Sequence, residues 1–84
     1  NHIVAGTIII MYDQSKKNIP QRIDEIQQSY QDVILSSAQY YLNKNFCLHI
    51  VTVKGEAHRL TELSDKLVSI RDIKHGKLVM SRAD

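Results

Sequence analysis

Four side chains that could bind a metal or an effector lie close together in the middle of the chain: Gln39, Tyr41, Cys47 and His49. A cysteine thiolate and a histidine imidazole are good donors to transition metals, so Cys47 and His49 form a candidate weak metal site. Tight sites usually need three or four strong nitrogen or sulfur ligands, and glutamine and tyrosine are poor substitutes. Two hypotheses remain: a weak metal or effector site at a subunit contact, or a buried free cysteine beside a hydrogen-bonded histidine. The residue types favour the second.

The same pair of residues raises the question of catalysis. Side chains two residues apart on a strand point the same way, so Cys47 and His49 could form a thiolate and imidazolium pair. No carboxylate of the same parity lies nearby in the sequence to orient the imidazole, and the three glycines lack the spacing of a phosphate-binding loop. His58 and His75 are isolated, and we expect them on the surface. The sequence therefore predicts no catalytic residues and a protein that is not an enzyme.

Length and composition narrow the class of protein. The chain has 84 residues, of which 43% are hydrophobic and 24% charged, which fits one small globular domain over residues 1–84. Its single cysteine cannot close an intramolecular disulfide, which favours the reducing cytoplasm. The longest apolar stretch, residues 3–11, is shorter than the roughly 18 residues that a membrane-spanning helix needs. We therefore expect a cytoplasmic protein with no membrane partner.

The charged residues are dispersed along the chain and nearly balanced. Eleven Lys and Arg against nine Asp and Glu give a net charge of +2. A nucleic-acid surface is usually a clustered basic stripe, whereas the adjacent pair Lys16 and Lys17 lies in a predicted turn. We therefore do not expect residues 1–84 to bind DNA by themselves.

The spacing of apolar residues predicts the elements that position the candidate site. One helix begins after Asn18, which could cap it together with Gln21, and ends near Gln31. A second helix begins just after Gly55. Residues 43–45 are a turn-forming connector of hairpin length. Strands are predicted over residues 3–12, 33–42, 46–54 and 77–81.

This order of strand, helix, strand, strand, helix and strand is the ferredoxin-like α+β pattern. Right-handed crossovers then place both helices on one face of a four-stranded antiparallel sheet. The short hairpin connector sets the register of the two middle strands, with Tyr41 opposite Cys47 and Gln39 opposite His49. The candidate ligands thus lie near the end of this hairpin.

The other face of the predicted sheet has no helix to cover it. The parity that we expect on this bare face is largely apolar, which is unusual for a solvent-facing sheet. We therefore expect it to pack on another copy of the chain, which would also support a domain with a small core. The hairpin residues expected under the helices are Ile34, Ala38, Leu42, Phe46, Leu48 and Ile50, and those expected on the bare face are Val33, Leu35, Gln39, Tyr41, Cys47, His49, Val51 and Val53.

Short segments along the whole chain resemble one known family. They are IIIMYD at 8–13, QRI at 21–23 with Gln27 further on, NFCL at 45–48, VKG at 53–55 and KHG at 74–76. Together they make residues 3–80 similar, without gaps, to the C-terminal domain of the nickel-responsive repressor NikR. The resemblance implies an ACT-like regulatory domain that assembles into a homotetramer. It also implies an N-terminal ribbon-helix-helix domain that binds DNA and is absent from residues 1–84.

The same resemblance implies a square-planar nickel site shared between two subunits. The family's cysteine ligand corresponds to Cys47, but its three histidine ligands correspond to Gln28, Gln39 and Tyr41, and His49 replaces a common carboxylate. Square-planar Ni(II) prefers imidazole and thiolate donors, and amide oxygens or neutral phenols compete badly with water for it. We therefore expect a degenerate nickel site and no tightly bound cofactor. A weak site formed by Cys47 and His49 with their copies in a partner chain is the remaining metal hypothesis.

The leading functional hypothesis is therefore the regulatory and oligomerisation domain of a NikR-like transcriptional regulator, tetrameric through its sheet face and bound to DNA only through the missing domain. Two alternatives remain open. One is an ACT-like module that binds a small molecule beside the first strand and first helix at a subunit interface. The other is a purely structural tetramerisation domain.

Overall fold

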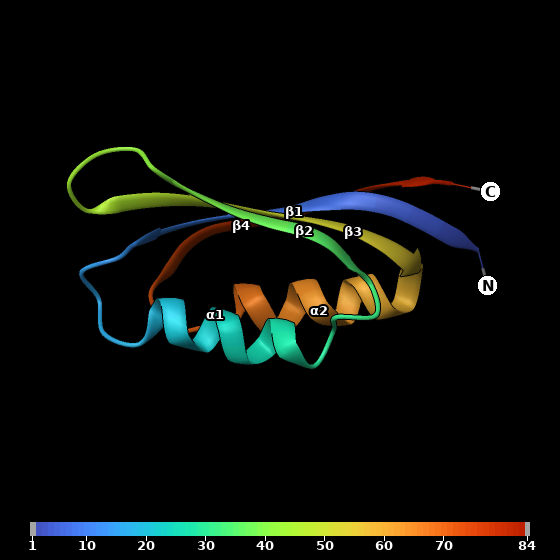
Figure 1. The fold of residues 1–84 in the computed structure, drawn as a ribbon, viewed down its shortest axis with the longest axis horizontal. Coiled ribbons are helices and arrows are strands. Elements are labelled where there is room, and N and C mark those ends of the chain that lie inside the picture. The colour runs from blue at the N-terminus through green and yellow to red at the C-terminus, as the bar shows by residue number, and fades with distance from the viewer. Residues whose placement is uncertain (1, 84) are drawn as a thin grey trace.

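The computed structural model describes residues 2–83, in which six elements form one sheet and one layer of helices (Figure 1). The order of strands and helices is the predicted one. The elements are β1 (Ile3–Asp13), α1 (Ile19–Gln28), β2 (Ile34–Tyr41), β3 (Phe46–Glu56), α2 (Ala57–Val68) and β4 (Ile73–Arg82).

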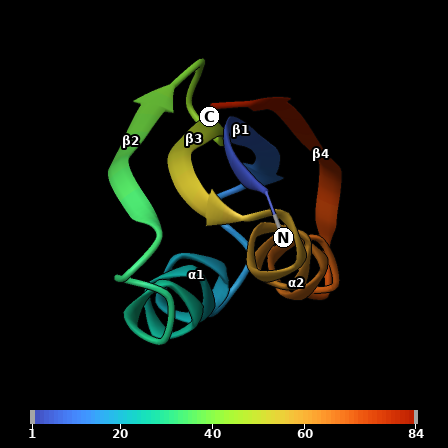
Figure 2. The same cartoon turned by 90° about the vertical axis from the view of Figure 1, so that its right-hand side faces the viewer.

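The four strands are antiparallel and lie in the order β2-β3-β1-β4, so that β3 and β1 are the central strands. Both helices lie on the same face of the sheet, as the side view and the end view agree (Figures 1 and 2). The predicted ferredoxin-like, ACT-like fold is therefore confirmed. Among residues 2–83 no helix has the length and apolar character needed to cross a membrane.

Two predicted element boundaries are wrong. β4 begins at Ile73, so His75 lies within a strand and not in the loop before it. The charged side chains of this segment hid the strand from the sequence pattern, but its backbone pairs with β1. α1 ends at Gln28, about one turn earlier than predicted. Asn18 precedes α1 in the left-handed conformation, with φ 73° and, within the described chain, no side-chain hydrogen bond to the helix, so the predicted cap does not form.

The predicted register of the hairpin is confirmed. Gln39 lies opposite His49 and Tyr41 lies opposite Cys47 in the β2–β3 ladder. The register shifts by one residue between Ile34 and Ser36, which is a bulge in the edge strand. Because paired residues in an antiparallel ladder share a face, Gln39 and Tyr41 lie on the same side of the sheet as Cys47.

The predicted faces of β3 are inverted. Its odd-numbered residues from 47 to 53 lie under the helices, and none of these four is more than 7% exposed. Both parities of β3 are apolar, so alternation alone could not show which face the helices cover. The corrected assignments are Cys47, His49, Val51 and Val53 under the helices and Ala38, Leu42, Phe46, Leu48 and Ile50 on the uncovered face. The partner residues Gln39 and Tyr41 point to the helix side of the sheet but are exposed on its edge strand. Val33 and Ile34 both pack with the core, whereas Leu35 is 63% exposed.

The uncovered side of the sheet, called here the open sheet face, is apolar despite this correction. Pairing along β1 extends it across all four strands, because Ile9 lies between Ile50 on one side and Lys77 on the other. Ile9 is 37% exposed and Val79 is 53% exposed. The apolar members of this face are Ile3, Ala5, Ile9, Met11, Ala38, Tyr40, Leu42, Phe46, Leu48, Ile50 and Val79.

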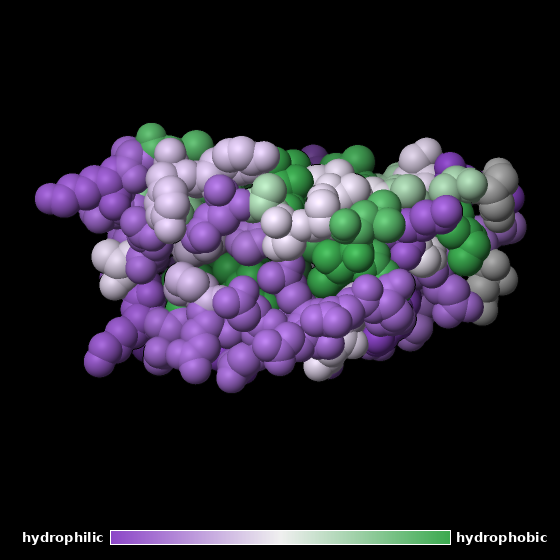
Figure 3. Space-filling view, viewed as in Figure 1, coloured by the Kyte–Doolittle hydropathy of each residue, from purple (hydrophilic) through white to green (hydrophobic). Residues whose placement is uncertain are grey.

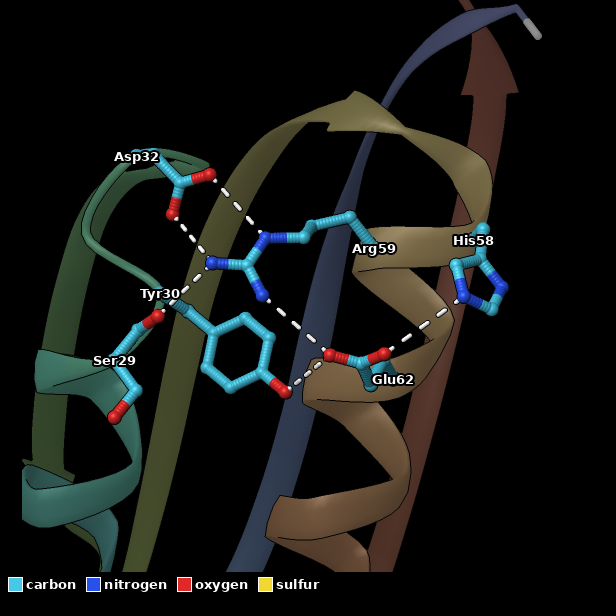
Figure 4. A network of polar contacts seen from close by, with 6 residues as sticks. All are labelled: Ser29, Tyr30, Asp32, His58, Arg59 and Glu62. Carbon is cyan, nitrogen blue, oxygen red and sulfur yellow. Dashed lines mark hydrogen bonds and ion pairs between the residues drawn. The ribbon is translucent and has the colours of Figure 1, made fainter.

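A network of polar contacts joins the end of α1 to α2 (Figure 4). The Tyr30 ring is buried, and its hydroxyl donates to Glu62 Oε1 at 2.7 Å. The Arg59 guanidinium lies 4.2 Å from the centre of that ring and donates to both carboxylate oxygens of Asp32, at 2.9 and 3.2 Å. It also donates to the Ser29 carbonyl at 3.0 Å. These contacts fix the turn after α1 to α2 and thereby set the position of α1 over the sheet.

This network makes the free energy of unfolding depend on pH in the acid range. Hydrogen bonds from Arg59 and Tyr30 hold the pKa values of Asp32 and Glu62 below their usual 3.8 and 4.5. A carboxylate with a lowered folded pKa stabilises the native state above its unfolded pKa and loses that contribution as the pH falls through the folded one. We therefore expect the free energy of unfolding, measured with urea, to fall as the pH is lowered below about 4.5.

Asp32→Asn and Glu62→Gln should each lower stability at neutral pH and flatten the acid limb. Asp65→Asn, which changes an exposed carboxylate of α2 outside the network, is the matched control and should leave that limb unchanged. An acid limb that is equally steep in all three variants would contradict this account.

Candidate functional site

The Gln39 side chain links two of the buried polar groups under the helices. Its Nε2 donates to the Tyr12 hydroxyl oxygen at 2.7 Å and lies 3.6 Å from Cys47 Sγ. These residues come from β2, β1 and β3, and the β1–β3 ladder places Tyr12 directly opposite Cys47. Tyr12 and Cys47 are both fully buried. One amide group therefore serves as donor to a phenol and a thiol in the interior.

Burial dominates the ionisation of Tyr12. Burial and the nearby Cys47 raise the pKa of the phenol and the hydrogen bond from Gln39 lowers it, with a net increase to about 12. Tyr12 is thus a neutral phenol at physiological pH. The cluster formed by Tyr12, Gln39 and Cys47 lies on the helix side of the sheet, where Tyr12 and Cys47 are buried and Gln39 is exposed.

His49 lies on the same face of β3 but makes a separate contact. Its Nε2 is 2.6 Å from Ser37 Oγ, and the residue is only 7% exposed. Burial lowers the pKa of the imidazole, and the negative charge of Asp24 only partly opposes this, so His49 is neutral at pH 7. Its Nδ1 is buried and has no hydrogen-bond partner among residues 2–83.

The structure therefore brings together some of the predicted site residues and not others. Gln39 contacts Cys47, and Tyr41 pairs with Cys47 across the ladder but is 65% exposed. Gln28 is an exposed residue of α1 that lines a groove facing β2. Cys47 and His49 share a face, as predicted, but it is the buried face and not the open one.

Sequence reasoning missed two residues of this region, Tyr12 and Ser37. The predicted strand 3–12 contains Tyr12, but the hairpin connector sets only the pairing of the two middle strands and leaves the partner of Tyr12 open. Ser37 follows from the hairpin register, since it pairs with Val51 and so lies on the face of His49. The register is therefore the signal that could have found Ser37, although its parity was predicted to lie on the bare face.

Solved structures with a similar fold come from proteins of distant sequence. The ACT domain of the GTP pyrophosphokinase of Chlorobium tepidum superposes with a TM-score of 0.71 at 16% identity, covering 89% of this chain and 96% of that one. A likeness at this identity shows the fold alone.

The sequence comparisons decide the family. The family described as "NikR C terminal nickel binding domain" matches residues 5–81. The chain belongs to this family. A protein of Thermococcus onnurineus named "Putative nickel-responsive regulator" is 41% identical over 78 residues, and a protein of the same name from Pyrococcus horikoshii is 40% identical over 81 residues.

These relatives are longer than the chain. The alignments cover 93% and 96% of this chain but only 56% and 59% of the two relatives. The chain therefore spans a little over half the length of the NikR relatives that it matches. The names of these relatives describe nickel response and regulation in those proteins.

Gln28, Gln39, Tyr41 and Cys47, where the resemblance leads us to expect nickel ligands, carry two amides, a phenol and one thiol. The Gln39 amide nitrogen lies 3.6 Å from the Cys47 sulfur. An amide N–H next to Cys47 Sγ donates a hydrogen bond and offers no lone pair to a metal. Among residues 2–83 no group of three or more His, Cys, Asp or Glu side chains could hold a metal ion.

The buried phenol gives the cluster a measurable signature. We expect one of the four tyrosines to titrate near pH 12 when tyrosinate absorbance is followed. Because the folded pKa is raised, Tyr12 stabilises the native state below its unfolded pKa of 10, and this contribution is lost as the pH rises through 10 towards 12. Tyr12→Phe should remove the late step, and Tyr40→Phe, which changes an exposed tyrosine, should leave it in place. A late step that persists in Tyr12→Phe would assign it elsewhere.

Proposed function

We propose that this chain is the regulatory and oligomerisation domain of a NikR-like transcriptional regulator whose DNA-binding part precedes it. Membership of the NikR C-terminal family carries this proposal. The length of the relatives supports it, because a little under half of each lies outside the matched region, which is enough for a further domain. In this proposal residues 1–84 form one domain, and DNA is bound through the preceding domain alone.

The nickel site is degenerate in this proposal. Its positions are Gln28, Gln39, Tyr41 and Cys47, of which only the cysteine retains a donor that suits Ni(II). The contact between Gln39 and Cys47 supports the proposal, since the amide fills the place beside the sulfur with a hydrogen-bond donor. A weak site at Cys47 and His49 is the alternative for metals, and the Ser37 contact of His49 Nε2 would have to be given up to form it through that nitrogen.

Restoring the donors tests the assignment. The unmodified chain should show no sub-micromolar nickel binding in calorimetric titration. Gln28→His, Gln39→His and Tyr41→His combined should bind one nickel per chain, with a thiolate-to-nickel charge-transfer band, because imidazole and thiolate together suit the square plane.

Two controls make this experiment decisive. Adding Cys47→Ser to the triple variant should remove the absorption band and most of the affinity. Weak binding by the unmodified chain that disappears in His49→Ala would establish the Cys47 and His49 alternative. Sub-micromolar nickel binding by the unmodified chain would overturn the degenerate site, and a silent triple variant would overturn the assigned positions.

The open sheet face is the proposed surface of assembly, and the proposed assembly is a homotetramer. Burial of a contiguous apolar face on another copy removes area from water at about 25 cal/mol per Å². The exposed Ile9 at its centre and Val79 beside it support this surface.

A charge on the open sheet face should break the assembly. We expect Ile9→Lys to reduce the mass measured by light scattering below that of the unmodified chain, because a lysine there would have to be buried unpaired. Val68→Lys is the matched control: Val68 is 39% exposed, close to the 37% of Ile9, but belongs to α2 on the opposite side. A monomeric unmodified chain, or an equal loss in both variants, would contradict assembly through this face.

A further inference from the structure

A polar groove of about 300 Å³ lies between α1 and β2. α1 packs against α2 and has fewer contacts with β2, which lies apart from it at the edge of the sheet (Figure 2). Figure 3 views the side where β2 and α1 lie one above the other, and hydrophilic side chains dominate its lower, helical part. The lining residues are Asp24, Gln27, Gln28, Gln31, Ile34 and Ser37.

One buried polar atom of the groove lining lacks a partner among residues 2–83. Gln27 lines the groove, and its Oε1 is buried without a hydrogen-bond partner there. An amide oxygen is an acceptor. Buried polar atoms are nearly always satisfied, so the unsatisfied Gln27 Oε1 calls for a donor.

The charge and size of the groove indicate which kind of ligand could supply the hydrogen-bond donor. Asp24 carries the only formal charge among the described lining residues, and it is negative. Its charge also acts on His49, whose Nε2 contacts the lining residue Ser37. A single water needs only about 30 Å³, so a groove about ten times larger has room for an organic molecule. The lining thus combines a carboxylate, amide oxygens and a hydroxyl with one short apolar wall at Ile34.

We propose that the groove between α1 and β2 binds a small organic cation that donates N–H hydrogen bonds, a primary amine or a guanidine. The cationic nitrogen pairs with Asp24 and donates to Gln27 Oε1, and the carbon chain of the ligand lies along Ile34. Hydrogen bonds between charged partners are among the stronger ones in proteins, which suits a shallow site. This inference goes beyond the proposed function, because it requires neither nickel binding nor its loss.

Titration of the isotope-labelled chain, followed by NMR shifts of the backbone amides, tests the inference. The probes are n-butylamine and agmatine; n-butanol removes the charge, and tetramethylammonium keeps the charge but has no N–H. Both amines should give saturable shifts confined to residues around the groove. Butanol and tetramethylammonium should give none.

Two pairs of matched variants distinguish amine binding in the groove from nonspecific effects of added ions. Asp24→Asn should weaken amine binding at least about tenfold, because it removes the charged partner, and Asp65→Asn on α2 should leave it unchanged. Gln27→Leu should also weaken binding without lowering the free energy of unfolding, since Oε1 has no partner to lose, and Gln21→Leu is its control.

Equal responses to butylamine and tetramethylammonium would overturn the proposal, as would equal binding by Asp24→Asn and Asp65→Asn. No saturable shift with either amine at millimolar concentration would overturn it too. Each of these outcomes can be told apart from failure of the proposed function, which rests on the nickel titration and the mass of the assembly.

Discussion

The two-residue period of β3 determines where most other features of this domain lie. β3 is a central strand with apolar residues on both parities, and the helices cover the parity that carries Cys47, His49, Val51 and Val53. A shift of the register by one residue would exchange the two faces completely. It would place the polar cluster in solvent and bury Leu48 and Ile50 instead. Which parity of β3 faces the helices therefore decides two things. It buries the thiol and the imidazole, and it leaves the open sheet face apolar.

Burying a thiol, a phenol and an imidazole together is costly unless each finds a partner. The side chain of Gln39 supplies a donor for Tyr12 and Cys47, and Ser37 supplies a partner for His49. Both partners come from β2, the edge strand, which therefore has polar residues on its inner side despite being half of a core hairpin. Gln39 therefore satisfies two buried groups at a position where the resemblance leads us to expect a metal ligand.

Much of the fold followed from the pattern of residues, and the errors have identifiable physical causes. The element order and the hairpin register depend on local spacing and on one short turn, and both are confirmed. The parity of β3 that is buried depends on the side on which the helices pack. Because the strand is apolar on both sides, its own sequence does not indicate that side. The start of β4 was missed because pairing with β1, not side-chain pattern, holds residues such as His75 in the sheet. Cys47, Gln39 and His49 could be named in advance as a cluster, but Tyr12 joins it only through the register between β1 and β3, which are far apart in sequence.

Polar contacts with α2, and not with β2, hold the turn after α1. The turn after α1 is held to α2 by Arg59, which bonds to Asp32 and stacks on Tyr30. With the helix held there, its polar side faces β2 across a groove, and Gln27 Oε1 and His49 Nδ1 stay without partners among residues 2–83. Each buried, unsatisfied group costs about 1–3 kcal/mol, against a total stability of about 5–15 kcal/mol for a domain. The contacts of Arg59 hold the end of α1 to α2, and the groove lies on the other side of the helix, between α1 and β2. A ligand that donates to Gln27 Oε1 in this groove, as proposed, would remove part of that cost.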